Sequence, residues 1–178
     1  MWSQGRFPHR NRDSMAQFAE AASRLGYPAV EINYVIPPEG VEELLASNHV
    51  SITSLHSPTP RVKDGNGRWS DALNLAALDD EERGQAVRLA CTTIDHAARA
   101  GARYVVVHLG GIETEGKSRM FDSERQLRRL FDSGVRDGDE VDDLRRQAHV
   151  QRLEGAVRNL PQARRSLAQI AEHAATNG

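Results

Sequence analysis

The sequence has little cysteine and no long apolar run, and each shortage excludes a class of protein. Cys91 is the single cysteine among 178 residues, which excludes an internal disulfide and any metal site built from several thiolates. A membrane span needs roughly 20 consecutive apolar residues, and the sequence contains no such stretch. The opening residues MWSQGRFPHRNR lack the apolar middle of a signal peptide. We therefore expect a soluble, cytoplasmic protein with no membrane partner.

The sequence also lacks a large excess of positive over negative charge, or of negative over positive. The formal net charge is -2 at pH 7, whereas nucleic-acid-binding domains usually carry a strongly basic face, so nucleic acid is not favoured as a partner. Hydrophobic residues make up 39% of the chain, which is enough for the core of one domain. We expect residues 1–178 to form a single domain.

Short apolar runs alternate with amphipathic helical patterns along the first two thirds of the chain. Strands are expected at Ala29–Tyr34, Val50–His56 and Arg103–His108. The strongest helical pattern lies between the last two strands, where Asp79 can cap its start and Gly101 its end. This order is typical of βαβ units. Because such crossovers are right-handed, we expect the three strands to be parallel and adjacent in sequence order.

Beyond the last strand the sequence becomes helical and charged. Residues 113–160 are expected to form a charged helical excursion with short apolar stripes, such as Leu127, Leu130 and Phe131. Pro161 is expected to separate this excursion from a final helix, because proline disfavours helical geometry at the residue before it.

Three polar residues interrupt the apolar strands near their carboxyl ends, namely Glu31, His56 and His108. Ligands of parallel α/β folds bind at these ends, and a polar group among apolar neighbours needs a partner or a function. We expect the three side chains to face one pocket. They are candidate substrate-binding residues, and His56 and His108 are also candidate ligands of a divalent metal such as zinc or manganese. The sequence identifies no catalytic residue.

A structural role is the alternative for each of these residues. A single histidine at a strand end is more often hydrogen-bonded structure than a ligand, and Glu31 can pair with an arginine or lysine instead of contacting substrate or metal. Gly110 and Gly111 could let a phosphate approach the backbone, although no glycine-rich nucleotide-binding motif is present. Cys91 lies on an apolar helix stripe and is expected in the core. The remaining histidines are expected to be solvated.

Several segments resemble, in order and spacing, the first four βα units of the sugar phosphate isomerase/epimerase family of xylose isomerase-like TIM barrels. The segments are RLGYPAVEINY, SITSLHSPTPR, DALNLAALDDEERGQAVRLACTTIDHAARAGARYVVVHLGGIE and SLAQIAEHAATNG. The resemblance extends from about Ser14 to Gly178. It implies an α/β protein with an incomplete (β/α)₈ TIM barrel, the N-terminal half, in which Met1–Gln4 would be the end of a first strand.

The resemblance also implies a function. Members of the family isomerise or epimerise a sugar or sugar phosphate with a divalent metal (Zn, Mn, Co or Mg) held at the carboxyl ends of the strands. His56 and His108 match histidines on the third and fourth strands, which touch substrate in sugar isomerases and bind zinc in the endonuclease IV branch. The family's principal metal glutamate follows the fifth strand, and this sequence has no matching position.

Three functions are therefore open: a fragment of a sugar phosphate isomerase/epimerase, an endonuclease IV-like DNA repair enzyme, or a non-catalytic interaction module. The net charge disfavours the DNA enzyme, and open sheet edges would allow self-association. Catalytic zinc sites usually have three protein ligands, but the strands offer only two imidazoles and one carboxylate. We therefore expect the isolated chain to lack a complete active site, to bind metal weakly and not to turn over sugar.

Overall fold

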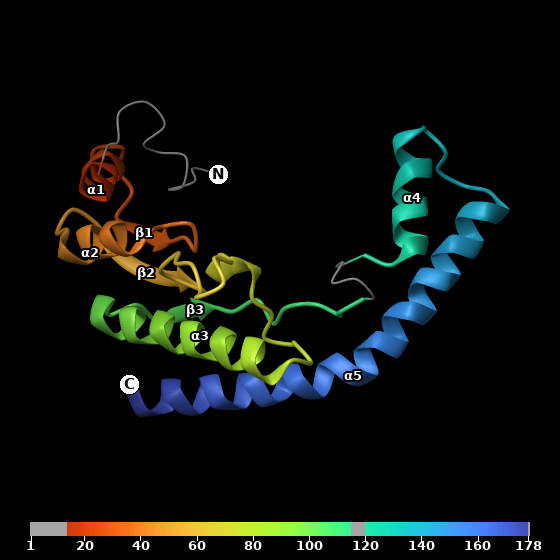
Figure 1. Cartoon of the computed structure of the whole chain (residues 1–178). Helices are drawn as coiled ribbons and strands as arrows, with labels where there is room; N and C mark the ends of the chain where they lie inside the picture. The colour runs from red at the N-terminus through yellow and green to blue at the C-terminus, as the bar shows by residue number, and fades with distance from the viewer. Residues whose placement is uncertain (1–13, 115–119, 178) are drawn as a thin grey trace.

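The structure of the chain is a computed structural model that describes residues 14–114 and 120–177. Its centre is a sheet of three strands, β1 (Ala29–Ile32), β2 (Ser51–His56) and β3 (Tyr104–Val106), in the order β1-β2-β3 (Figure 1). Both pairings are parallel, so the expected topology is confirmed. Within the described residues the sheet stays open, with β1 and β3 at its edges, as in part of a TIM barrel.

Strands β1 and β3 end earlier than the sequence pattern predicts, whereas β2 ends at His56 as expected. After β1, Asn33 begins a turn in which its side-chain Oδ1 accepts a hydrogen bond from the Val35 N–H at 3.1 Å. The pairing of β3 ends at Val106, although the chain was expected to remain a strand as far as His108. The expected strand end at Met1–Gln4 lies outside the described residues.

Two helices pack together beside β1. Helix α1 (Met15–Arg24) is capped by Ser14, whose Oγ accepts a hydrogen bond from the Gln17 N–H at 3.3 Å. Helix α2 (Pro38–Ala46) starts at a proline, a residue suited to the first turn of a helix. With the strands and the end of α3, these helices bury the first core cluster: Met15, Phe18, Ala19, Ile32, Ile36, Val41, Leu44, Ile52, Leu55 and Ala97.

Helix α3 (Asp80–Ala100) connects β2 to β3 and makes their parallel arrangement possible. The Asp79 Oδ1 accepts a hydrogen bond from the Glu82 N–H at 2.8 Å, and Gly101 ends the helix in the left-handed conformation with φ 63°. Both caps were expected from the sequence. Since a helical crossover returns the chain to the same end of the sheet, the carboxyl ends of the strands share one edge.

Helix α4 (Asp122–Asp132) and the first part of helix α5 (Asp139–Asn177) form a hairpin that projects away from the sheet (Figure 1). The two helices are joined by a bidentate ion pair in which the Arg152 guanidinium donates to both Glu124 carboxylate oxygens at 2.6 Å. None of the described helices combines the length and apolar character that crossing a membrane requires.

Pro161 does not separate two helices, so this expectation was wrong. Helix α5, which is 39 residues long, continues without a break through Pro161, although proline removes one backbone hydrogen-bond donor. Side chains on both sides of the proline anchor α5 to the same loop. The Asn159 Nδ2 donates to the Ala76 carbonyl at 2.8 Å, and the Ser166 Oγ donates to the Leu75 carbonyl at 2.7 Å. These buried hydrogen bonds outweigh the local preference for a break.

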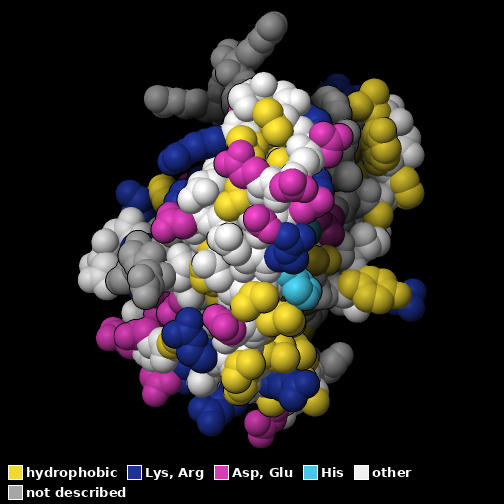
Figure 2. Space-filling view, turned by 90° about the vertical axis from the view of Figure 1, so that its right-hand side faces the viewer, with side chains coloured by type: hydrophobic (Ala, Val, Ile, Leu, Met, Phe, Trp, Pro, Cys, Tyr) yellow, Lys and Arg dark blue, Asp and Glu magenta, His cyan; other side chains and the backbone are white. Residues whose placement is uncertain are grey.

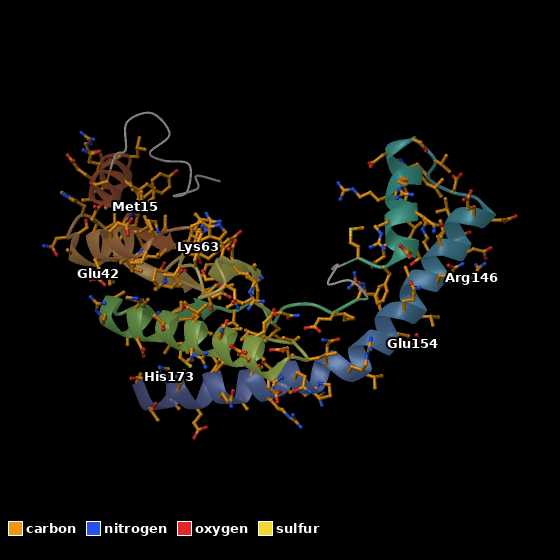
Figure 3. All side chains as sticks on the ribbon, viewed as in Figure 1. Met15, Glu42, Lys63, Arg146, Glu154 and His173 are labelled. Carbon is orange, nitrogen blue, oxygen red and sulfur yellow. The ribbon has the colours of Figure 1, made fainter. Side chains whose placement is uncertain are left out.

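The last turns of α5 lie along α3. His173, which was expected to be solvated, has its Nε2 2.7 Å from Asp95 Oδ1 and so connects the two helices (Figure 3). Cys91 packs against the core cluster between α3 and α5, as expected. Burial, together with the nearby Asp95 carboxylate, raises the pKa of the Cys91 thiol. This thiol is therefore poorly suited to be a nucleophile.

Strand β3 is largely exposed, although its sequence is apolar. Tyr104 is 62% exposed and Val106 is 38% exposed. An apolar run such as YVVVHL is typical of a strand covered on both faces, but β3 is an edge strand among the described residues. Helix α5 also exposes apolar side chains, among them Val157 at 76%. This part of the molecule therefore presents uncovered apolar surface.

Candidate functional site

The register of the sheet brings polar side chains of β1, β2 and the segment after β3 to one edge. Glu31 is the partner of Ser54 across β1 and β2, and His56 is the partner of Val106 across β2 and β3. Side chains two residues apart in a strand point to the same face of the sheet. Ser54, His56 and Glu31 therefore share a face, and His108 follows β3 two residues beyond the partner of His56.

These side chains form a continuous line of hydrogen bonds, which we call the strand-end cluster (Ser54, Glu31, His56 and His108). The Ser54 Oγ donates to Glu31 Oε2 at 2.7 Å, and His56 Nδ1 lies 2.9 Å from Glu31 Oε1. His56 Nε2 lies 2.8 Å from His108 Nε2, with the two rings stacked at a centroid distance of 4.9 Å. The side chains of Glu31, His56 and His108 therefore contact one another in series. Of the three, His108 lines the neighbouring cavity.

The chemistry of the groups assigns the protons of the cluster. An ionised carboxylate only accepts hydrogen bonds, so His56 Nδ1 carries a proton and donates it to Glu31. The 2.8 Å contact between the two Nε2 atoms needs one shared proton. Either His108 donates this proton to a neutral His56, or a protonated His56 donates it to His108. The pair can therefore hold a proton in two positions.

Glu31 is kept ionised by its neighbours. Partial burial alone would raise its pKa, but hydrogen bonds from His56 and Ser54 and the charge of His56 outweigh this effect and lower the pKa of the Glu31 carboxyl below its ordinary value. Among the described residues, the partners of Glu31 are thus a histidine and a serine, and no arginine or lysine pairs with it. The sequence reasoning missed Ser54, although its spacing of two residues from His56 was the available signal.

A cavity of about 480 Å³ opens beside the strand-end cluster. Figure 2 shows the molecule from the side on which the α4–α5 hairpin lies, where acidic, basic and hydrophobic side chains are interspersed. Among the groups that line the cavity are Tyr34, Ser57, Ser70, Asp71, His108, Gly110 and Gly111. Hydroxyl, carboxylate and imidazole groups beside apolar ones are suited to a small polar ligand.

A second residue that the sequence did not indicate, Asn74, positions one wall of this cavity. Its Nδ2 donates to the Gly111 carbonyl at 2.9 Å, and its Oδ1 accepts from the Gly111 N–H at 3.1 Å. Gly110 has φ 89°, and a Cβ there would lie 1.8 Å from Asn74 Oδ1. The close approach that requires this glycine is therefore made by Asn74, so the chain offers no open phosphate cradle at Gly110.

The strand-end cluster fits a divalent metal only in part. Its two Nε2 atoms are suitable donors, but a tetrahedral zinc site would hold them about 3.3 Å apart and unprotonated, whereas they are 2.8 Å apart and share a proton. Glu31 binds the opposite nitrogen of His56, which is the position of a carboxylate that orients a metal-binding histidine. No group of three or more possible metal ligands exists within residues 14–114 and 120–177.

The family model for the xylose isomerase-like TIM barrel matches residues 19–178 of the chain. This match covers nearly all of the described strands and helices, including the whole strand-end cluster. No curated protein matches the chain, and no solved structure matches it either.

Proposed function

The chain belongs to the xylose isomerase-like TIM barrel family, and from this premise we propose that it forms the sugar-binding and proton-carrying part of a sugar phosphate isomerase/epimerase-like protein. The observation that carries the proposal is the hydrogen-bonded line from Glu31 through His56 to His108, which ends at the wall of a cavity. Aldose-ketose isomerisation and epimerisation both move a proton at the carbon beside a carbonyl group. A histidine pair backed by a carboxylate is suited to accept and return such a proton.

The proposed proton transfer uses this chain's own residues. His108, at the cavity wall, accepts the proton from the sugar carbon next to the carbonyl. The electron pair of the broken C–H bond forms the double bond of an enediolate, and the carbonyl oxygen takes the negative charge. Glu31 stabilises the positive charge that the histidine pair gains. The adjacent hydroxyl group gives its proton to the former carbonyl oxygen, and His108 returns its proton to the former carbonyl carbon, which gives the isomer. Epimerisation would need a second acid that protonates the same carbon from the opposite face.

A divalent ion such as Zn, Mn, Co or Mg, when bound, would polarise the sugar carbonyl and stabilise the enediolate oxygen. His56 and His108 are the residues that would hold it, and Glu31 would orient His56. Because the described residues bring only two nitrogens to this point, we expect the isolated chain to bind sugar without turning it over.

Ligand-observed NMR tests the proposal. Saturation-transfer spectra of the 178-residue chain with a panel of aldoses, ketoses and their phosphates should show binding that His108→Ala weakens about tenfold or more. The matched control is His149→Ala, which removes an exposed imidazole from α5. Binding that is equally strong in wild type and His108→Ala would refute the assignment of the site.

A second candidate function, a non-catalytic interaction module, is favoured by the exposed edge of β3. Tyr104 and Val106 leave apolar surface uncovered there, and an unpaired strand edge can pair with a second copy of the chain. Sedimentation velocity should then show a dimer that Val106→Lys converts to a monomer, because lysine at a strand edge opposes pairing. A monomeric wild-type chain at about 100 μM would exclude this candidate.

A further inference from the structure

We propose that Arg61 and Lys63, held on the indole of Trp69 beside the cavity, bind an anionic group of the sugar, so that the ligand is a sugar phosphate or a sugar acid. This inference rests on the proposed function for the location of the sugar. It further specifies that the sugar is charged. The strand-end cluster alone does not distinguish a charged sugar from a neutral one.

A short hairpin after β2 carries these residues to the cavity. Lys63 and Trp69 form an antiparallel bridge, and the Ser70 N–H donates to the Val62 carbonyl at 2.8 Å. The same hairpin continues into Ser70 and Asp71, which line the cavity. Figure 3 shows Lys63 near the carboxyl-terminal end of β2. The hairpin is thus part of the cavity's surroundings.

Both cations are positioned by one aromatic ring. The Arg61 Cζ lies 4.2 Å from the centroid of the Trp69 ring, and the Lys63 Nζ lies 4.7 Å from it. Two cations this close to one ring are within about 9 Å of each other, a distance that the oxygens of a phosphate and a sugar can bridge together. Contact with the indole restricts two flexible side chains, which lowers the entropy lost when an anion binds.

The positive charge of the hairpin is only partly neutralised. Arg68, the third cation of the hairpin, donates to Asp64 at 2.8 Å and to Glu82 at 2.9 Å, so its charge is compensated. No carboxylate of the described chain lies within ion-pair distance of the Lys63 ammonium. Among the described residues, the charge of Lys63 is therefore in contact with the Trp69 ring but is not paired with a carboxylate.

Arg61 is also incompletely neutralised. Its Nε lies 3.9 Å from Asp71 Oδ1, which is too long for a hydrogen bond, and neither atom has a hydrogen-bond partner among the described residues. Asp71 therefore lowers the positive potential here without cancelling it. The two positive charges of Arg61 and Lys63 therefore outnumber the negative charge of Asp71, the charged residue of the hairpin that lines the cavity, in a protein whose overall formal charge is -2. An anionic ligand is favoured at this location over a neutral one.

The fluorescence of Trp69 reports on this site directly. The sequence contains two tryptophans, so Trp2→Phe leaves Trp69 as the only one. This protein is titrated with glucose 6-phosphate, gluconate, glucose and inorganic phosphate at constant ionic strength. We expect a saturable fluorescence change with at least one charged sugar, affinity for glucose at least tenfold weaker, and competition by inorganic phosphate if the phosphate ester is preferred. Comparing the phosphate ester with gluconate distinguishes the two sources of the anion.

Variants then locate the anion. Lys63→Gln and Arg61→Gln should each weaken binding of the charged sugar about tenfold, which is the effect of losing one charge-assisted contact. The matched control is Arg103→Gln, because Arg103 also lies over an aromatic ring, Tyr104 at 5.6 Å, but precedes β3 at the opposite end of the sheet. Its effect on affinity should be negligible.

The outcomes separate this inference from the proposed function. Glucose binding as tightly as its charged forms, no binding of any charged sugar, or unchanged affinity in both Lys63→Gln and Arg61→Gln would each overturn the anion site. Binding of a charged sugar that depends on Lys63 but not on His108 would leave the anion site standing and refute the proposed role of the histidine pair.

Discussion

Gly155 provides a sharp test of how the segment after β3 packs on α5. A Cβ added to Gly155 would lie 2.3 Å from Ile112 Cγ2 and 3.5 Å from Ile112 Cβ. Ile112 directly follows the glycine pair that lines the cavity. Gly155→Ala therefore tests whether α5 packs against the segment that forms the Gly110–Gly111 wall of the cavity.

Two opposing effects set the magnitude. Alanine favours a helix interior over glycine by about 1 kcal/mol, whereas overpacking a closely packed contact costs about 1 to 3 kcal/mol. The clashing methyl is attached to a β-branched carbon and cannot easily rotate away. We expect Gly155→Ala alone to lower the free energy of unfolding by about 0 to 2 kcal/mol. In an Ile112→Ala background only the 3.5 Å contact with the Cβ of residue 112 remains. Gly155→Ala should then raise the free energy of unfolding by about 1 kcal/mol.

Urea unfolding followed by circular dichroism measures the four proteins of this double-mutant cycle. Gly84→Ala is the matched control, because it lies in α3 with Arg88 Nη1 as its nearest neighbour at 3.5 Å. It should stabilise by about 1 kcal/mol in either background. If Gly155→Ala stabilises the wild-type and Ile112→Ala proteins equally, Ile112 does not pack on α5 and the reasoning is wrong.

Three further predictions concern the metal, the carboxylates and the helical hairpin. Calorimetric titration with zinc, manganese and cobalt should show only weak binding, and submicromolar affinity that His56→Ala or His108→Ala abolishes would contradict this. The lowered pKa of Glu31 adds stability that is full above its ordinary value of 4.5 and lost as pH falls through its lower folded-state value. The difference in unfolding free energy between wild type and Glu31→Gln should therefore shrink below about pH 4.5, and a constant difference from pH 7 to pH 3 would oppose it. Hydrogen bonds from Arg152 lower the pKa of Glu124; Glu124→Gln should cost about 1 kcal/mol in thermal unfolding at pH 7, and an unchanged midpoint would show that this ion pair does not stabilise the hairpin.

The locally encoded features of the fold were predictable from the sequence. Ser14 and Asp79 cap helices through bonds to residues three positions later, and Gly101 ends a helix by its own backbone conformation. These effects need no distant contact. The alternation of such helices with apolar runs then restricts the sheet to a parallel order, which places His56 and His108 at one edge.

The contacts within the site were less predictable. Period-two alternation puts His56 and Ser54 on one face, but the bond from His56 to Glu31 depends on the register of β1 against β2. Asn74 binds Gly111 across 37 residues of sequence, and nothing in the residues near Asn74 indicates this partner. Hydrogen bonds between residues distant in sequence depend on how close the helices, strands and loops that carry them lie in the folded chain.

The sequence by itself determined the capped start of α1, both ends of α3, the parallel order of the strands and the polar residues near their carboxyl ends, because each follows from local hydrogen bonding or apolar periodicity. Only the tertiary structure decided that α5 continues through Pro161, that β3 stays exposed and that Glu31 contacts the Nδ1 atom of His56. The buried bonds of Asn159 and Ser166 outweigh a local helix-breaking preference. Exposure depends on which elements cover a strand, and the role of a carboxylate depends on which nitrogen of a histidine it reaches.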